Sequence, residues 1–498
     1  MDQGLIDEVL AERGRAFDDA RPHAVEAAHA RGELTARERI AALIDEGSFV
    51  EYGVLAEASP DDPGNAPADG AVCGSALLCG RPVLVAGYDR AVYGGTQSDR
   101  NQRKLERLLF LAYERRWPFV CFAAGDGARV LEGAGEGRMG SAGGRFGLFD
   151  GLAELSGWVP TVAVLSGRSL AGNVSLALMS DFVVATRGAE LGGPTLHDDS
   201  RSADYHEGIG DIDLVVEDDR AAVDAVRRYL AYYLLDLPAG EPSPAAASIR
   251  SIVPDNRRRA YDMRKVIDAV SDDGSVLELR PNWARSMLTA FARLDGRSVG
   301  IFANQPQSPL AGAIDPDAAD KLCRFVELCD AYEFPLVSFV DNPGFMVGPD
   351  AERAGIARHH ARPLMALHHR TVPLYSVQIR KAYGLGPFAM SGYGHSRLVP
   401  DLRLAWPSVE SGGMSLEGAA YLVRRREILA AETPAEARRI RDEYASTVRE
   451  MNSGLKAGRN YSFDDIVDPA ETRDRIISLL RRTPRRLPDA KKHAIDTV

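Results

Sequence analysis

Glycine-rich turns that follow short apolar runs are the segments of this chain best suited to chemistry. Small residues at a strand end, just before a helix, leave backbone N–H groups uncovered where the helix dipole favours negative charge. Such a turn can hold a phosphate or an oxyanion, although a tight corner without a ligand is the alternative for any single one. The candidate turns span residues 125–129, 133–137, 167–173, 341–348 and 380–386.

These turns occur twice because the sequence repeats itself. Gly296-Arg297-Ser298-Val299 repeats Gly80-Arg81-Pro82-Val83, and Lys321 and Gly344 repeat Lys104 and Gly127 at nearly the same offset along the chain. A repeat of this long period indicates two related domains, each with its own core. Ala171 and Leu385 follow Val159 and Val372 at nearly equal separations, so we expect matching oxyanion turns in the two halves.

Other common chemistries lack their motifs. No Gly-Lys-Ser/Thr follows a glycine-rich loop and no Gly-x-Ser-x-Gly elbow occurs, which argues against a Walker-type nucleotide site and a serine hydrolase. No His-Glu-x-x-His pattern occurs, and the neighbouring arginines of His359 and His360 would repel a cation, so we expect no metal site. The five cysteines form no Cys-x-x-Cys pair and are expected to be reduced core residues.

Length, charge and hydropathy limit the class of protein. The 498 residues exceed the length at which a single core stops growing, about 250 to 300 residues. A net charge of −11 argues against nucleic acid as a partner. The sequence contains no run of about 18 apolar residues, so we expect no membrane span. The acidic N-terminus has no apolar signal core. We therefore expect a cytoplasmic protein that binds neither nucleic acid nor membrane.

Short apolar runs alternate with helical patterns in both halves, which indicates an α/β fold with covered sheets. The predicted strands include 83–86, 119–122 and 161–165 in the first half and 300–303, 336–340 and 374–379 in the second. A helix is predicted over 97–116, and Thr35 with Glu38 suits a capping box near the N-terminus. Residues 239–256 are rich in Pro, Ala and Ser and are the predicted linker between domains 1–238 and 257–498.

Four longer motifs carry a family resemblance. HARGELTARERIAALIDEGSFVEYG from His29, VDNPGFMVG from Val340, IRKAYGLGPFAM from Ile379 and AWPSVESGGMSLEGA from Ala405 resemble the carboxyltransferase (β) subunit of biotin-dependent acyl-CoA carboxylases. The resemblance extends to the propionyl-CoA, acetyl-CoA and methylcrotonoyl-CoA carboxylases. It implies two tandem crotonase-like domains that arose by internal duplication, with acyl-CoA bound by the first and biotin by the second. It also implies a homo-hexamer, a trimer of dimers, with active sites formed between halves of different subunits.

The resemblance also implies site residues. Ala171 and Gly172 would stabilise a thioester enolate, and Leu385 and Gly386 would hold the ureido oxygen of biotin. Phe388 matches a position that influences the choice of acyl chain. The chain departs from the family at Leu385, where glycine is usual, and at Asp126. The implied substrate-binding residues are Gly127, Ala128, Arg129, Gly344, Gly384 and Phe388.

The expected reaction moves a carboxyl group from carboxybiotin to the α-carbon, or a vinylogous carbon, of an acyl-CoA. Removing the α-proton of a thioester places charge on the carbonyl oxygen, and fixed backbone donors stabilise that charge. The resemblance implies biotin on a separate carrier protein as the cofactor, and a biotin carboxylase and the biotin carrier subunit as partners. The alternatives are an acyl-CoA decarboxylase or lyase with the same turns, and a non-catalytic assembly subunit.

Overall fold

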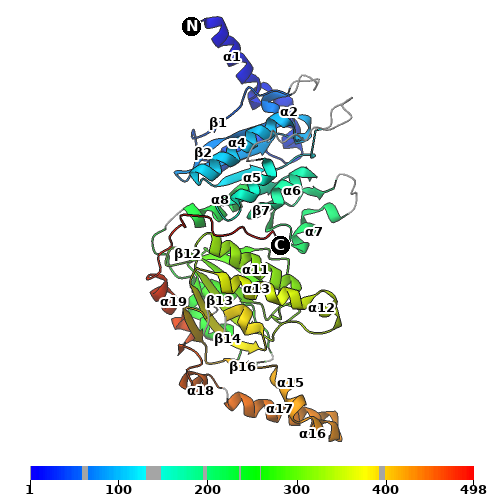
Figure 1. Cartoon of the computed structure of the whole chain (residues 1–498), viewed down its shortest axis with the longest axis vertical. Helices are drawn as coiled ribbons and strands as arrows, with labels where there is room; N and C mark the ends of the chain where they lie inside the picture. Colours follow the sequence, from blue (N-terminus) through cyan, green and yellow to red (C-terminus); the bar gives the residue numbers. More distant parts are fainter. Residues whose placement is uncertain are drawn as a thin grey trace. The chain divides into compact units, whose positions relative to one another are not determined.

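The computed structural model describes residues 2–58, 66–129, 147–193, 199–234, 237–257, 259–391, 399–451 and 453–497 (Figure 1). The chain forms two compact units. The first comprises Met1–Leu235 together with Asp489–Thr497, and the second comprises Asp236–Pro488. Each unit has its own buried apolar core, as the internal repeat predicts.

The first unit contains a mixed sheet in the order β1-β2-β3-β4-β5-β7-β9, with β1, β2 and β3 antiparallel and the later strands parallel. A second, two-stranded sheet pairs β6 with β8. The strands are β1 (Val50–Glu51), β2 (Ala71–Leu78), β3 (Arg81–Tyr88), β4 (Phe119–Phe122), β5 (Thr161–Leu165), β6 (Arg168–Leu170), β7 (Phe182–Thr186), β8 (Glu190–Gly192) and β9 (Leu214–Val216). The helices are α1 (Gln3–Arg15), α2 (Pro22–Ala30), α3 (Ala36–Leu43), α4 (Asp99–Arg115), α5 (Leu148–Leu155), α6 (Gly172–Leu178), α7 (Ala203–Ile209) and α8 (Asp219–Leu234).

Helix α4 shows how local sequence sets these elements. Ser98 caps its N-terminus by accepting the N–H of Asn101, whose side chain accepts the N–H of Ser98 in return. Its buried residues recur at helical spacing and pack in the core under the sheet. The helix ends where Arg116 takes a left-handed conformation before Trp117 and Pro118. The capping box predicted at Thr35 and Glu38 is likewise present at the start of α3.

The second unit repeats the arrangement with the order β10-β11-β12-β13-β14-β15-β17, and β16 pairs with β14. The predicted strands of both halves all lie within observed strands. The strands are β10 (Leu277–Leu279), β11 (Met287–Leu294), β12 (Arg297–Asn304), β13 (Leu336–Asn342), β14 (Leu374–Tyr383), β15 (Leu402–Ala405), β16 (Glu410–Gly412) and β17 (Asp465–Ile466). The helices are α9 (Ile249–Ile252), α10 (Arg264–Val270), α11 (Pro316–Ala331), α12 (Pro349–Arg353), α13 (Ile356–His369), α14 (Gly386–Ser391), α15 (Leu416–Val423), α16 (Arg425–Ala430), α17 (Pro434–Met451), α18 (Gly454–Arg459) and α19 (Thr472–Leu480).

The two repeated lysines occupy matching positions. Lys104 on α4 donates from Nζ to the carbonyl oxygens of Ala68 and Ala71. Lys321 on α11 donates to the carbonyl oxygens of Arg280, at 2.8 Å, and Trp283, at 2.9 Å. Each ammonium is buried and is therefore paired with backbone acceptors, which ties the long helix to the segment that leads into β2 in the first unit and into β11 in the second.

The observed units differ in detail from the predicted boundaries. Within residues 239–256, which the sequence marks as a linker, a 3₁₀ turn (Pro244–Ser248) and α9 pack onto the second unit, and Ile249 is buried in its core. Residues 489–497 lie with the first unit, where Lys491 donates to the carbonyl oxygens of Ala153 and Glu154. Composition alone does not reveal these contacts, because one buried isoleucine provides the first and hydrogen bonds of Lys491 provide the second.

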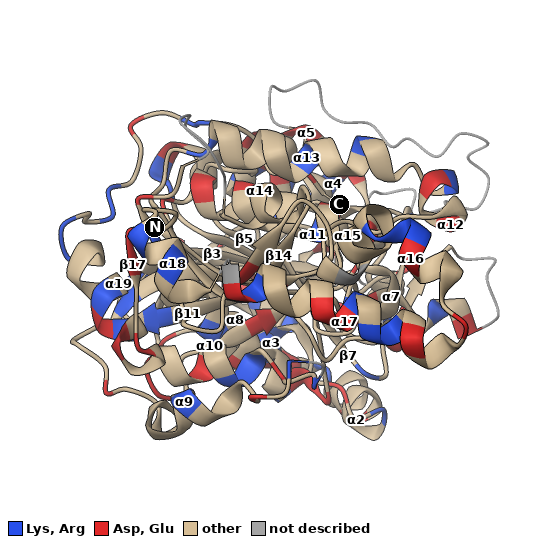
Figure 2. Ribbon diagram, turned by 90° about the horizontal axis from the view of Figure 1, so that it is seen from below, with Lys and Arg blue, Asp and Glu red and all other residues tan. Residues whose placement is uncertain are grey.

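The surface carries both signs of charge. Figure 2 shows acidic and basic residues interspersed along α16 and α17. Four of the five cysteines are buried as expected, whereas Cys79 is exposed. Among the described helices, none combines the length and the apolar character needed to cross a lipid bilayer.

Candidate active site

The first candidate turn connects β6 to α6. Ala171 adopts a positive φ of 49° with ψ of −121°, a conformation that side chains disfavour. Its N–H donates to the carbonyl oxygen of Gly192 on β8, at 3.0 Å. Gly172 begins α6, and within the described part of the chain its N–H has no hydrogen-bond partner. The N–H available to a ligand is therefore that of Gly172, whereas Ala171 forms the turn.

A second loop of the first unit, after β4, lies against this turn. The backbone of Gln97 binds this loop at two points. Its N–H donates to the carbonyl of Gly127, at 2.7 Å, and its carbonyl accepts the N–H of Arg129, at 2.8 Å. The intervening N–H of Ala128 has no partner within the described residues. A Cβ on Gly127 would lie 3.8 Å from the nitrogen of Gly172, so the two uncommitted donors lie on adjoining segments.

The second unit repeats this arrangement. Ile314 donates its N–H to the carbonyl of Gly344, at 3.1 Å, and accepts the N–H of Met346, at 2.8 Å. The intervening N–H of Phe345 again has no partner among the described groups. Leu385, next to the start of α14, has an uncommitted N–H of the same kind. Within the described part of the chain, these loops thus give each unit two backbone donors that no internal acceptor uses.

By its hydrogen bonds, Ala171 corresponds to Gly384. This is one residue before Leu385, with which the sequence pattern paired it. Gly384 has a φ of 59° and donates its N–H to the carbonyl of Gly412 at 3.0 Å, which is the arrangement that Ala171 makes with Gly192. Gly384 also lies as far after Val372 as Ala171 lies after Val159. The residue that matches Gly172 is therefore Leu385, and Gly386 matches the residue after Gly172. The pairing predicted from the sequence was one residue out of register, because glycine occurs on both sides of Leu385.

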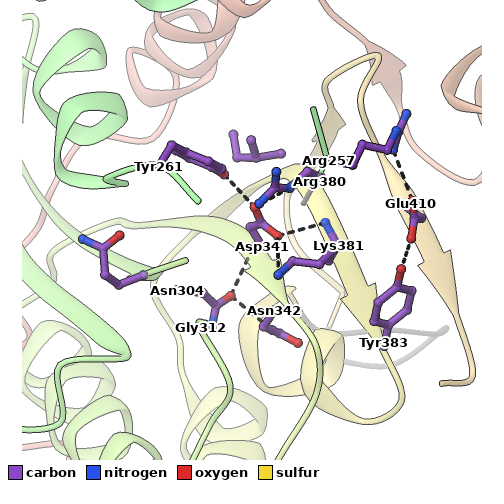
Figure 3. A network of polar contacts seen from close by, with 12 residues as sticks. Arg257, Tyr261, Asn304, Gly312, Asp341, Asn342, Arg380, Lys381, Tyr383 and Glu410 are labelled. Atoms are coloured by element: carbon purple, nitrogen blue, oxygen red, sulfur yellow. Dashed lines mark hydrogen bonds and ion pairs between the residues drawn. The ribbon is translucent and has the colours of Figure 1, made fainter. Parts of the chain in front are cut away.

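A buried carboxylate lies under the second turn (Figure 3). Asp341, at the end of β13, is fully buried and accepts the hydroxyl of Tyr261, at 2.8 Å, the Nε of Arg380, at 3.1 Å, and the N–H of Lys381, at 3.1 Å. Burial, followed by the charge of Asp341, raises the pKa of Tyr261 well above its usual value, so this hydroxyl remains a donor. Asp341, Arg380 and Lys381 belong to two candidate turns of the sequence, but no local pattern indicates that these turns contact each other.

The carboxylate stabilises a bulge in β14. Val340 pairs with Gln378 and Asn342 with Ala382, so Asp341 lies opposite an enlarged stretch of β14 that includes Arg380 and Lys381. The bulge leads directly into the turn at Gly384. The acidic side chain therefore fixes the direction in which the strand enters the turn.

Glu410 on β16 supports the same strand. It accepts the hydroxyl of Tyr383 and the guanidinium group of Arg257, at 3.2 Å (Figure 3). It also accepts Nε of Arg449, at 2.9 Å. Because Tyr383 directly precedes Gly384, these contacts anchor the end of β14.

Arg129, a predicted substrate-binding residue, and Asp126, a departure from the family pattern, both have charged partners within the first unit. Arg129 is nearly buried, and its guanidinium donates to Asp69 at 2.6 Å and to Thr96. Its side chain therefore stabilises the first unit internally. Asp126, an unusual acidic residue in this loop, pairs with Arg168 at 3.4 Å. Its charge is thus partly compensated.

The remaining predicted residues lie at the turns. Phe388 is half-buried on α14 and donates its N–H to the carbonyl of Leu385, at 3.1 Å. The ring of Phe345 packs on His360 with 3.8 Å between ring centroids, and burial lowers the pKa of this histidine. Among the described residues, no cluster of His, Cys, Asp and Glu could hold a metal ion.

The candidate turn at 133–137 lies outside the described residues. At the described turns, three side-chain amides contact the loops, although the sequence motifs assigned no role to any of them. Asn173 and Asn342 each accept a backbone N–H of a donor loop, and the Gln97 side chain lies beside Gly172. The offset between the repeats would have matched Phe345 with Ala128, but no local pattern distinguishes an uncommitted N–H from a bonded one.

Comparison with known proteins identifies the family. The model of the carboxyl transferase domain family matches residues 27–494, so this chain belongs to that family. The methylmalonyl-CoA carboxyltransferase 12S subunit of Propionibacterium freudenreichii subsp. shermanii is 35% identical and aligns over 99% of this chain and 97% of its own length. The propionyl-CoA carboxylase carboxyltransferase subunit of Haloferax mediterranei is 33% identical over 98% of both chains.

Solved structures agree with the fold. The transcarboxylase 12S hexamer, crystallised with methylmalonyl-coenzyme A and methylmalonic acid, has a TM-score of 0.86 at 34% identity, over 99% of this chain and 98% of that one. A single-chain, multi-domain long-chain acyl-CoA carboxylase has a TM-score of 0.88 at 38% identity, and this chain spans 49% of its length. The protein is a carboxyltransferase of the biotin-dependent acyl-CoA carboxylase family, with two tandem crotonase-like domains.

Proposed function

We propose that the two donor pairs divide the reaction between them. In the first unit, Gly172 and Ala128 bind the thioester oxygen of an acyl-CoA, and in the second unit, Leu385 and Phe345 bind the ureido oxygen of biotin. The observation that supports this proposal is the pair of uncommitted N–H groups at matching places in both units. Residues predicted to act with them, Ala171 and Gly386, shape the turns.

The first-unit pair suits an enolate. When the α-carbon loses its proton, or its carboxyl group in the reverse direction, negative charge develops on the thioester oxygen. Two fixed N–H groups stabilise this charge without reorganising, and loss of one such donor costs about 100- to 1000-fold in kcat. The N-terminus of α6 adds a favourable dipole at Gly172.

The second-unit pair fits biotin, because a urea oxygen accepts two hydrogen bonds and gains charge when its carboxyl group leaves. When bound, biotin supplies the nitrogen that carries the carboxyl group and that takes the substrate proton. The side chain of Leu385 is 54% exposed, so its size does not prevent its own N–H from donating. Asp341 and Glu410 keep the strand before this turn in place.

The proposed substrates are short acyl-CoA thioesters of the propionyl-CoA and methylmalonyl-CoA pair. This proposal rests on the names of relatives that are 35% and 33% identical over nearly the whole chain. The biotin carrier and a biotin carboxylase are the proposed partner subunits. A hexamer is proposed from the 12S structure, whose assembly is hexameric.

The test is transfer of a labelled carboxyl group from carboxylated biotin to acetyl-, propionyl-, butyryl- and octanoyl-CoA by the purified chain. We expect the highest kcat/KM with propionyl-CoA. Absence of transfer to every acyl-CoA, from free and carrier-bound biotin alike, would contradict the proposal and favour an assembly subunit.

Decarboxylation is the second candidate. The α subunit of the methylmalonyl-CoA decarboxylase of Propionigenium modestum is 32% identical over 94% of both chains. The same enolate donors serve either direction, because the enolate is common to both. Release of CO2 from methylmalonyl-CoA without biotin would favour a lyase, whereas biotin-dependent loss of the carboxyl group fits the carboxyltransferase.

A further inference from the structure

Asn173, the second residue of α6, accepts the N–H of Gly127 with its side-chain Oδ1, at 3.1 Å. The residue is fully buried. Its Nδ2 has no hydrogen-bond partner among the described groups. A buried donor without a partner costs about 1 to 3 kcal/mol, a cost that alanine at this place would not carry. Packing alone therefore does not account for an asparagine here.

Gly125 faces Asn173, and there is no room for a side chain at this position. A Cβ on Gly125 would lie 2.2 Å from the carbonyl oxygen of Gly95 and 2.6 Å from Nδ2 of Asn173. Because backbone blocks one side and the amide the other, position 125 can only be glycine. The acceptor for Gly127 must then come from the helix.

The second unit also has an amide acceptor for the loop N–H, but it comes from the end of the strand and not from the helix. Asn342, at the end of β13 (Figure 3), matches Gly125 at the offset that relates Gly344 to Gly127, and its Oδ1 accepts the N–H of Gly344 at 3.0 Å. The helix position that matches Asn173 is Gly386, where a Cβ would lie 2.1 Å from Oδ1 of Asn342. The two units have exchanged asparagine and glycine across the same gap, and the amide acceptor is what they share.

The next N–H in each loop is the uncommitted one, on Ala128 and on Phe345. We propose that Asn173 is a positioning residue that holds the Gly127 peptide, so that the N–H of Ala128 is presented to the reacting oxygen. This inference rests on the proposed role of Ala128 as a donor. Asn342 has the same role for Phe345 in the second unit.

The experiment compares Asn173→Ala and Asn173→Ser with the wild type in carboxyl transfer to propionyl-CoA. We expect kcat to fall on the order of 10- to 100-fold for alanine, because small misplacements of catalytic groups have effects of this size. The KM for propionyl-CoA should change less than about threefold, since CoA contacts elsewhere remain. Serine keeps an acceptor oxygen and should restore part of kcat.

The control is Asn460→Ala, which removes an exposed amide at the end of α18 in the second unit and should leave kcat unchanged. Thermal melting of each variant monitors folding, and if the alanine variant does not fold, the serine variant decides. Wild-type kcat in a folded alanine or serine variant would overturn the positioning role, as would a rise in KM with kcat unchanged. An inactive wild type would instead contradict the proposed function.

Discussion

Ala171 and Gly384 occupy the same position in the two units. Each follows a strand, has a positive φ and donates its N–H to a glycine carbonyl on a neighbouring strand at 3.0 Å. The first unit makes this turn with alanine, which disfavours the conformation, and the second makes it with glycine, which tolerates it. The turn geometry is thus retained where the residue type is not.

Relief of strain should stabilise the first turn. Replacing Ala171 with glycine removes a conformational cost of about 1 to 3 kcal/mol, partly offset by the greater freedom of glycine in the unfolded chain. We expect the Tm of Ala171→Gly to equal or exceed that of the wild type, with kcat retained. The reciprocal Gly384→Ala should lower the Tm. Thermal melting checks both, and a lower Tm for Ala171→Gly would contradict the strain.

A side chain at Gly172 should reduce catalysis. Its Cβ would lie 2.6 Å from Oε1 of Gln97, so Gly172→Val must displace this buried amide or the turn. We expect kcat to fall by about 100- to 1000-fold through loss of one donor. Gly188→Val is the matched control, because a Cβ there meets no atom within 4 Å. Labelled carboxyl transfer is the measurement, and equal kcat for the two variants would exclude the assigned role.

Removal of the carboxylate under the second turn should destabilise that unit. Asp341→Ala leaves the buried guanidinium of Arg380 without its counter-charge, which costs about 3 to 5 kcal/mol. Asp341→Asn keeps the shape and should cost less. The difference in Tm between the variants measures how much the charge of Asp341 contributes to stability. A Tm for the alanine variant equal to that of the wild type would show that the network does not stabilise the unit.

Lys104 should make stability depend on alkaline pH. Burial lowers its pKa below the ordinary 10.5, so between the folded and unfolded pKa values the unfolded chain binds more protons. The contribution of Lys104 to the free energy of unfolding therefore rises with pH between these two pKa values. At lower pH the lysine is charged in both states, and its burial disfavours the folded state. The Tm difference between wild type and Lys104→Met should grow from pH 7 to 10. Lys265→Met, at an exposed lysine, should show no such growth.

Phe388 provides a test of substrate choice. The family resemblance places the acyl-chain position here, on α14 beside Leu385. Phe388→Ala should shift the preference toward longer acyl chains, because it removes a large ring. The ratio of kcat/KM for octanoyl-CoA over propionyl-CoA measures the shift, and an unchanged ratio would remove Phe388 from the site.

The sequence by itself determined the duplication, the α/β class and the segments that form the turns. The repeat that relates Lys104 to Lys321 holds in space, since both lysines secure a long helix to backbone carbonyls. Strong local patterns of this kind are legible because strand, helix and cap preferences act over a few residues.

The tertiary structure alone decided which backbone N–H groups lack a partner among the described residues. It matched Gly172 with Leu385, gave the Arg129 side chain an internal partner and assigned Asn173 to the Gly127 peptide. It also placed residues 489–497 with the first unit. These features depend on hydrogen bonds between segments far apart in the chain, and a local pattern contains no information about which distant acceptor a given N–H will meet.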